Sequence, residues 1–171
     1  MTEEEFWALI VATDPAADDS EVLTARLAVL PDEELRDFEV TLNRLLDAAY
    51  RGDLWDAAYL INDGCSDDGF EYFRCRLVAQ GPSVYAEALR DPDSLAGHPA
   101  VIADQDHYEC ESLLYAAGQA YAARTGLDPA RFYDRCDTSS PGAKTLLIDH
   151  ARDHAELVRR LPRLTALLLD G

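Results

Sequence analysis

The sequence predicts an all-α fold, a single-domain multi-helix bundle of about seven to nine helices, on three observations. Helix-capping patterns recur along the 171 residues, and apolar residues recur at intervals of three and four. No segment alternates apolar and polar residues between turns, as a half-buried strand does. We expect one domain over residues 1–171, with a possible subdivision into a helical core at 1–90 and a C-terminal helical layer at 106–171.

Three helices are predicted in the first 50 residues. Thr2 and Glu5 form a Thr-x-x-Glu capping box that opens the first helix. Asp14-Pro15 ends it, because the residue before a proline avoids the helical conformation. A second helix is predicted from residue 19 or 20 to 30. Pro31 opens a third, whose apolar residues share one helical face: Leu35, Phe38, Leu42, Leu45, Leu46 and Ala49.

Three shorter helices follow. Asp53 is positioned to cap a fourth helix at 54–61, which stops at residues 62–64. Ser66 or Asp67 caps a fifth, and Gly81-Pro82 separates the fifth from a sixth that ends near Arg90. Residues 91–99 contain prolines and a glycine and are predicted to form a loop.

The C-terminal part is also predicted to be helical. A long helix is expected at about 106–125, with Gly126 suited to end it. Asp128-Pro129 starts a short helix at 131–133, and residues 137–142 read as a turn or loop. Residues 145–169 have a helical composition, with a break or kink at Pro162.

Acidic side chains dominate the composition. Asp and Glu number 33 against 15 Lys and Arg, which gives a net charge of −18. This charge excludes binding to nucleic-acid backbones and argues against anionic membrane surfaces, because both require a basic face. Residues 1–60 carry 15 acidic and 4 basic side chains, so the N-terminal third is the more negative surface. A basic protein is therefore the partner that the composition favours.

The four cysteines indicate a reducing compartment. No pair has the Cys-x-x-Cys spacing of a zinc ribbon or a redox motif, and the first residues do not form a signal peptide. No apolar run is long enough to span a membrane. We expect a cytoplasmic protein with buried free thiols. Cys65 is flanked by acidic residues, which raise the pKa of a thiol and argue against a catalytic cysteine.

The most unusual stretch is residues 53–81. It contains Leu-Trp-Asp-Ala-Ala-Tyr at 54–59, Gly-Cys-Ser-Asp-Asp-Gly-Phe at 64–70 and Tyr-Phe-Arg at 72–74. This stretch resembles the hallmark segment of a bacterial family, domain of unknown function 4240. Four further segments fit the same family pattern: 3–7, 91–95, 109–111 and 161–164. The chain departs from the pattern after Pro141-Gly142, where the Trp of that region is missing. The resemblance implies the fold class and brings no established activity.

Two interpretations of residues 62–74 are open. In the first, they form a corner between two helices, with Gly64 and Ser66 or Asp67 as caps and the neighbouring aromatic residues in the core. In the second, the excess of polar residues over what one cap needs lines a pocket. Eight residues are then candidates for ligand or partner contacts: Trp55, Tyr59, Asn62, Asp67, Asp68, Tyr72, Arg74 and Glu109.

Metal sites fit the sequence poorly. With Asp63 as the first position of an EF-hand loop, Asp68 stands where glycine is required and Arg74 where glutamate is required. His150 and His154 are spaced to share a helix face, as zinc ligands can be. However, no third ligand is indicated, and the Glu that follows the first His of a zincin motif is missing. We predict no metal and no cofactor.

The leading functional hypothesis is a binding or regulatory protein whose acidic surface meets a basic partner. One concrete version is an immunity-type inhibitor that blocks a basic nuclease toxin by electrostatic steering and charge pairing. The alternative is an enzyme or small-ligand-binding protein with a polar pocket at the 62–74 turn. A third option is a structural subunit, which stable oligomerisation would distinguish. The sequence assigns neither a reaction nor an oligomeric state.

Overall fold

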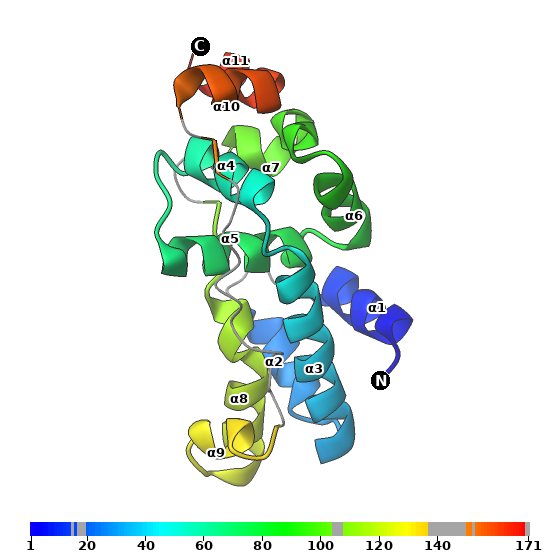
Figure 1. Cartoon of the computed structure of the whole chain (residues 1–171). Helices are drawn as coiled ribbons and strands as arrows, with labels where there is room; N and C mark the ends of the chain where they lie inside the picture. Colours follow the sequence, from blue (N-terminus) through cyan, green and yellow to red (C-terminus); the bar gives the residue numbers. More distant parts are fainter. Residues whose placement is uncertain (15, 17–19, 104–107, 137–149, 152, 170–171) are drawn as a thin grey trace.

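The all-α prediction is confirmed. The computed structural model describes residues 1–14, 16, 20–103, 108–136, 150–151 and 153–169. Within these ranges the chain forms eleven α-helices and one 3-10 helix and contains no strand (Figure 1). The expected number of seven to nine is slightly low, because short elements at 92–97, 99–103 and 130–133 add to the longer helices.

The N-terminal helices follow their local sequence signals closely. They are α1 (Glu3–Thr13), α2 (Glu21–Leu27) and α3 (Asp32–Ala48). The capping box is formed, since Thr2 Oγ1 accepts from the Glu5 N–H at 3.2 Å and Glu5 accepts from the Thr2 N–H at 2.7 Å. The predicted apolar stripe of α3 is buried along its whole length.

The central helices are α4 (Gly52–Ile61), α5 (Asp67–Ala79) and α6 (Pro82–Arg90). Ser66 is the cap of α5, and its Oγ accepts from the Gly69 N–H at 3.0 Å. The prediction that Asp53 caps α4 is wrong by two residues. Arg51 occupies the N-cap position, while Asp53 lies in the first turn and accepts from the Arg51 guanidinium at 3.0 Å.

The segment that follows α6 departs from the predicted loop. It forms a 3-10 helix, η1 (Pro92–Gly97), and then α7 (Pro99–Ala103). The Asp91 side chain starts η1 by accepting from the Asp93 N–H at 3.2 Å. Prolines break long helices but are well tolerated at the first turn of short ones, which is why the loop prediction failed here.

The next long helix, α8 (Ser112–Thr125), begins later than predicted. Tertiary hydrogen bonds hold the preceding residues out of the helix: Asn62 Oδ1 accepts from the Tyr108 N–H at 3.0 Å, and the Tyr72 carbonyl accepts from the Cys110 N–H at 3.1 Å. Gly126 ends α8 in the left-handed conformation, with a φ of 71°. The predicted short helix is α9 (Ala130–Tyr133).

The C-terminal helices are α10 (His154–Arg160) and α11 (Pro162–Leu168), so the predicted break at Pro162 is confirmed. The idea that His150 and His154 share a helix face is wrong. Asp153 caps α10 by accepting from the Glu156 N–H at 2.9 Å, which leaves His150 outside the helix. The turn predicted at 137–142 lies outside the described residues.

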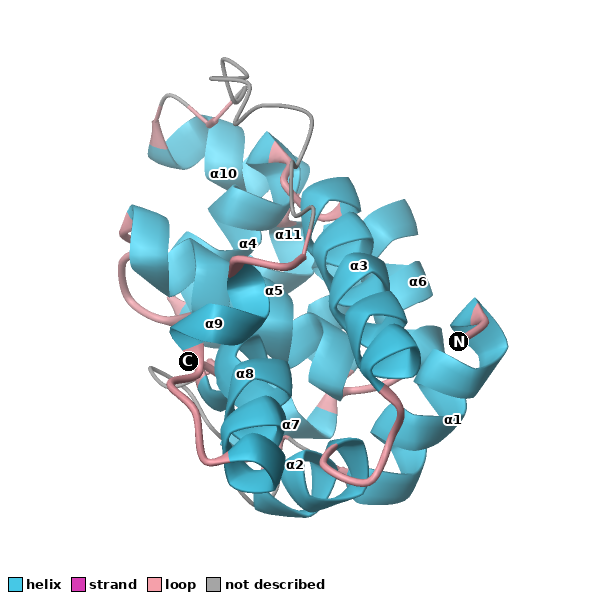
Figure 2. Cartoon of the chain, turned by 90° about the horizontal axis from the view of Figure 1, so that it is seen from below, coloured by secondary structure: helices cyan, strands magenta, loops and turns pink. Residues whose placement is uncertain are grey.

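The helices are arranged in tiers along the molecule. In Figure 1, α8 and α9 lie at one end, α5 crosses the middle, and α10 and α11 lie at the other end. Helices α2 and α8 pack along each other, as Figure 2 also shows, while α11 packs against α4 and η1. All four cysteines are free, and three of them are buried, as expected for reduced thiols. No helix among the described residues is long and apolar enough to cross a membrane.

Candidate functional site

A pocket of about 620 Å³ lies between α4 and the start of α10. One face of α4 and the turn after it form the first wall, because residues four apart on a helix point the same way. The lining residues of this wall are Trp55, Asp56, Tyr59, Leu60, Asp63 and Cys65. The opposite wall comes from the C-terminal segment and consists of His150, Ala151, Asp153, His154, Leu157 and Leu169.

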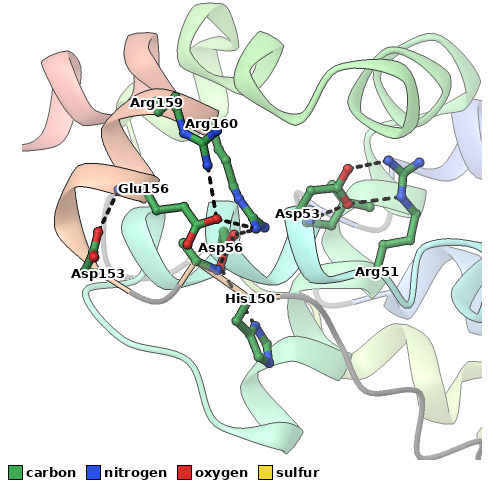
Figure 3. Close-up of polar contacts among 10 residues, drawn as sticks. Arg51, Asp53, Asp56, His150, Asp153, Glu156, Arg159 and Arg160 are labelled. Carbon is green, nitrogen blue, oxygen red and sulfur yellow. Dashed lines mark hydrogen bonds and ion pairs between the residues drawn. The ribbon is translucent and has the colours of Figure 1, made fainter.

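Asp56 joins the two walls. Its side chain is only 6% exposed, and its two oxygens each accept from the Ala151 N–H at 3.0 Å. Arg160 Nη1 donates to the same carboxylate at 3.2 Å, and His150 Nδ1 lies 3.8 Å away. Burial raises the pKa of the Asp56 carboxyl, although the Ala151 N–H and the Arg160 charge oppose this. Asp56 therefore clamps the C-terminal segment onto α4 (Figure 3).

An ion-pair network backs this clamp. Figure 3 shows Arg160 between Asp56 and Glu156, with Nη2 donating to Glu156 Oε1 at 2.8 Å. Arg159 reaches the same oxygen at 3.2 Å. The guanidinium of Arg160 is thus engaged with two buried carboxylates and neutralises charge behind the pocket wall, and it does not line the pocket. Asp63 and Asp153 are the lining carboxylates that stand outside this network.

The aromatic wall of the pocket is built on α4. The Trp55 ring packs on Phe70 with centroids 4.5 Å apart and meets the His150 ring edge to face at 5.1 Å. Tyr59, one turn further along, is 52% exposed. The corner interpretation placed both α4 aromatics in the core. The structure leaves Trp55 half-buried and Tyr59 open to solvent at the pocket.

A second hollow of about 360 Å³ lies beside the segment that precedes α8. Glu109 lines this hollow, and Asn62 Nδ2, which lies outside it, donates to Glu109 Oε1 at 3.5 Å. Tyr72 also reaches this segment: burial and the hydrogen bond to Glu111 raise the pKa of its phenol to about 12. These contacts hold residues 108–110 outside the helix and give Asn62, Tyr72 and Glu109 a structural role.

The remaining predicted site residues lie elsewhere. Arg74 is buried, donates Nη1 to the Leu46 carbonyl at 2.9 Å and stacks over the rings of Tyr50 and Phe70 at 5.0 Å. Asp67 and Asp68 are exposed in the first turn of α5 and line neither hollow. The eight predicted residues thus fall into separate groups, with Trp55 and Tyr59 alone in the α4–α10 pocket.

Sequence reasoning missed most of the pocket. Asp63 lies one turn beyond Tyr59, so the helical spacing that groups Trp55 with Tyr59 was a usable signal for it. No comparable signal existed for Asp153 or Leu157. Their segment is about 95 residues from α4 in the sequence, and the hydrogen bond from the Ala151 N–H to Asp56 brings the two together.

The described lining residues include groups used in acid–base chemistry, and no activated nucleophile is among them. His150 beside a buried Asp56 resembles the base and orienting carboxylate of a catalytic pair. Cys65 lines the same pocket, yet burial, Glu109 and Asp67 raise the pKa of its thiol to about 11. Such a thiol is protonated at neutral pH and is a poor nucleophile. Among the described residues, no group of three His, Cys, Asp or Glu side chains is arranged to hold a metal ion.

These features define an all-α protein with a mixed aromatic and acidic pocket between its fourth helix and its C-terminal helices. A family model described as protein of unknown function (DUF4240) matches residues 1–123. The match covers most of the chain, and the chain belongs to this family, as the central motif predicted. The α4 wall of the pocket lies inside the matched segment and the α10 wall lies beyond it. No curated protein and no solved structure matches the chain.

Proposed function

We propose that this chain is a cytoplasmic binding or regulatory protein that recognises a basic protein through an acidic surface on α1 and α3. The observation that carries the proposal is that two helices in contact with each other both begin with three acids. Phe6 of α1 packs on Phe38 of α3 with ring centroids 5.0 Å apart, so the helices lie side by side. Three acids begin each helix: Glu3, Glu4, Glu5, Asp32, Glu33 and Glu34.

Intramolecular ion pairs neutralise part of this surface, since the N-terminal ammonium of Met1 pairs with Asp37 of α3. Arg44 Nη2 pairs with Glu3 at 2.6 Å, and Arg124 pairs with Asp32. Within the described chain, no ion pair or hydrogen bond is made by the exposed carboxylates of Glu4, Glu33 and Glu34. Acids in the first turn stabilise a helix through its dipole, which accounts for part of the charge. Their concentration on two adjacent helices supports an additional role in attracting a cationic partner.

A predominantly acidic surface speeds association with a basic protein and makes binding sensitive to salt. An immunity-type inhibitor of a basic toxin is the concrete version of this role. Such a complex would place the acids of α1 and α3 against the cationic surface with which a nuclease holds its substrate.

The test compares the wild-type protein with a triple variant, Glu4→Gln, Glu33→Gln and Glu34→Gln. We expect a pull-down at low salt to recover a basic protein with the wild type, and its recovery to fall sharply with the variant and in high salt. The control removes three exposed acids elsewhere, by Glu21→Gln, Glu87→Gln and Asp134→Asn. Equal recovery with both variants, or the absence of any basic partner, would contradict the proposal.

The α4–α10 pocket supports a second candidate function, the binding of a small organic group. Its volume of about 620 Å³ lies in the range of ligand sites, and the turn after α4 forms part of it. This candidate does not depend on the acidic surface. A small neutral solute with an apolar stem, such as butylurea, should enter the pocket and perturb the Trp55 indole signal in an NMR spectrum.

A further inference from the structure

We infer that the α4–α10 pocket selects an organic cation, namely a guanidinium or ammonium group on a short aliphatic stem. The inference rests on the second function proposed above and names the ligand class of that pocket. Its basis is the combination of aromatic rings, carboxylates and apolar side chains in one cavity.

The charge of the lining favours a cation. The described lining residues include three carboxylates, and neither Lys nor Arg is among them. Asp56 is already paired with Arg160 and with the Ala151 N–H, so it supplies little further attraction. Asp63 has no hydrogen bond or ion pair within the described chain, and Asp153 uses Oδ1 alone as the cap of α10. These two carboxylates remain as acceptors for a ligand.

The aromatic residues suit the same ligand. A guanidinium or ammonium group within about 6 Å of an aromatic ring face is attracted by the ring quadrupole, most strongly by Trp and then Tyr. Trp55 is half-buried against Phe70, so its ring is held in place, while Tyr59 is exposed beside it. Leu60 and Leu157 line the cavity and suit the aliphatic stem.

The guanidinium or ammonium group could belong to a free small molecule or to an Arg or Lys side chain of a protein. Two probes separate these sources. Butylguanidinium represents the free cation, and a short peptide with a single arginine represents the side chain. Each has a neutral partner of nearly the same shape, butylurea for the first and the same peptide with citrulline for the second.

The pocket can be neutralised without disturbing its backbone. Asp63 has a φ of 49°, in the left-handed region that asparagine tolerates best among the residues with a side chain. Asp153 is an N-cap, and asparagine caps helices as well as aspartate does. Asp63→Asn with Asp153→Asn therefore removes two charges and keeps both local structures. Asp67→Asn with Asp68→Asn removes two charges just outside the pocket as the matched control.

The experiment follows the Trp55 indole N–H signal during titration with each probe, with Trp7→Phe used to assign the two indole signals. We expect the wild type to bind at least one cationic probe about tenfold more tightly than its neutral partner. The Asp63 and Asp153 variant should lose most of that preference, and the Asp67 and Asp68 variant should keep it. Tyr59→Ala should weaken cation binding several-fold.

The outcomes separate the two levels of the proposal. Equal binding of charged and neutral probes overturns the cation preference and leaves the ligand-binding function standing. Absence of binding by all four probes overturns both. Loss of the preference in the Asp67 and Asp68 variant, with no effect of the Asp63 and Asp153 variant, would move the site to the start of α5 and overturn this assignment. A response to the arginine peptide without a response to butylguanidinium identifies a protein side chain as the ligand.

Discussion

The carboxyl of Glu39 should make the stability of the fold fall as pH rises through the neutral range. Glu39 lies on α3 with its side chain turned into the protein, where it is 6% exposed. Asn43 Nδ2 donates to Glu39 Oε1 at 2.9 Å, while Oε2 is buried without a hydrogen-bond partner in the described chain. Burial raises the pKa of Glu39 to about 7, and the Asn43 hydrogen bond only partly opposes this.

The magnitude follows from linkage between protonation and folding. Between pH 4.5 and 7, the folded protein retains a proton on Glu39 that the unfolded chain has released. The stabilisation is complete below pH 4.5 and is lost as pH rises through about 7. At about 1.4 kcal/mol for each unit of pKa, the loss amounts to roughly 3 kcal/mol. That is a large fraction of the stability of an ordinary domain.

The perturbation is Glu39→Gln, because glutamine has the shape of the protonated carboxyl and cannot ionise. Urea unfolding followed by circular dichroism at intervals from pH 4 to 8 gives the free energy of unfolding of each protein. We expect the variant to match the wild type near pH 4.5 and to exceed it by roughly 3 kcal/mol at pH 8. Taking the difference at each pH cancels the titration of the other groups.

The control is Glu33→Gln, an exposed position in the first turn of the same helix, where loss of the charge should lower stability by no more than about 1 kcal/mol at any pH. A constant difference between wild type and Glu39→Gln from pH 4 to 8 would refute the reasoning. It would mean that Glu39 ionises in the fold at its ordinary pH and that a water or a neighbour satisfies Oε2.

Three further predictions concern stability and reactivity. Asp93→Ala should lower the free energy of unfolding in urea by about 3 kcal/mol. The buried Asp93 carboxylate accepts the backbone N–H groups of Arg163 and Leu164, at the start of α11, at 2.9–3.0 Å. Unchanged stability would show that α11 packs in place without this carboxylate. Gly118→Ala should lower the free energy of unfolding by about 1–3 kcal/mol, since the new Cβ would come within 2.8 Å of the Tyr133 side chain. In a Tyr133→Ala background the clash is gone, and the same substitution should stabilise the protein by up to about 1 kcal/mol, because alanine favours a helix more than glycine does. The pKa of the Cys65 thiol is raised to about 11, so Cys65 should react with iodoacetamide at pH 8 more than tenfold slower than free cysteine. Glu109→Gln should speed this reaction, because the Glu109 charge contributes to the raised pKa. A rate equal to that of free cysteine would contradict the buried, acidic environment of the thiol.

Local signals in the sequence predicted local structure well. The Thr2 capping box, the apolar stripe of α3 and the break at Pro162 are confirmed, because each depends on residues within a turn or two of one another. The family followed from a contiguous motif at 53–81 in the same way. Errors arose where a distant contact competes with local preference, as at the start of α8, where Asn62 accepts from the Tyr108 N–H and holds that residue outside the helix.

The sequence by itself therefore determined the fold class, most helix boundaries and two residues of the α4 wall, Trp55 and Tyr59, since these follow from patterns within single helices. Only the tertiary structure decided what faces that wall. The Asp56 clamp brings residues 150–151 and α10 to α4 across about 95 positions, and it turns a surface of Trp55 and Tyr59 into a cavity. A buried carboxylate needs a hydrogen-bond partner, and which distant backbone N–H becomes that partner depends on the folded chain. Composition and periodicity do not predict this pairing.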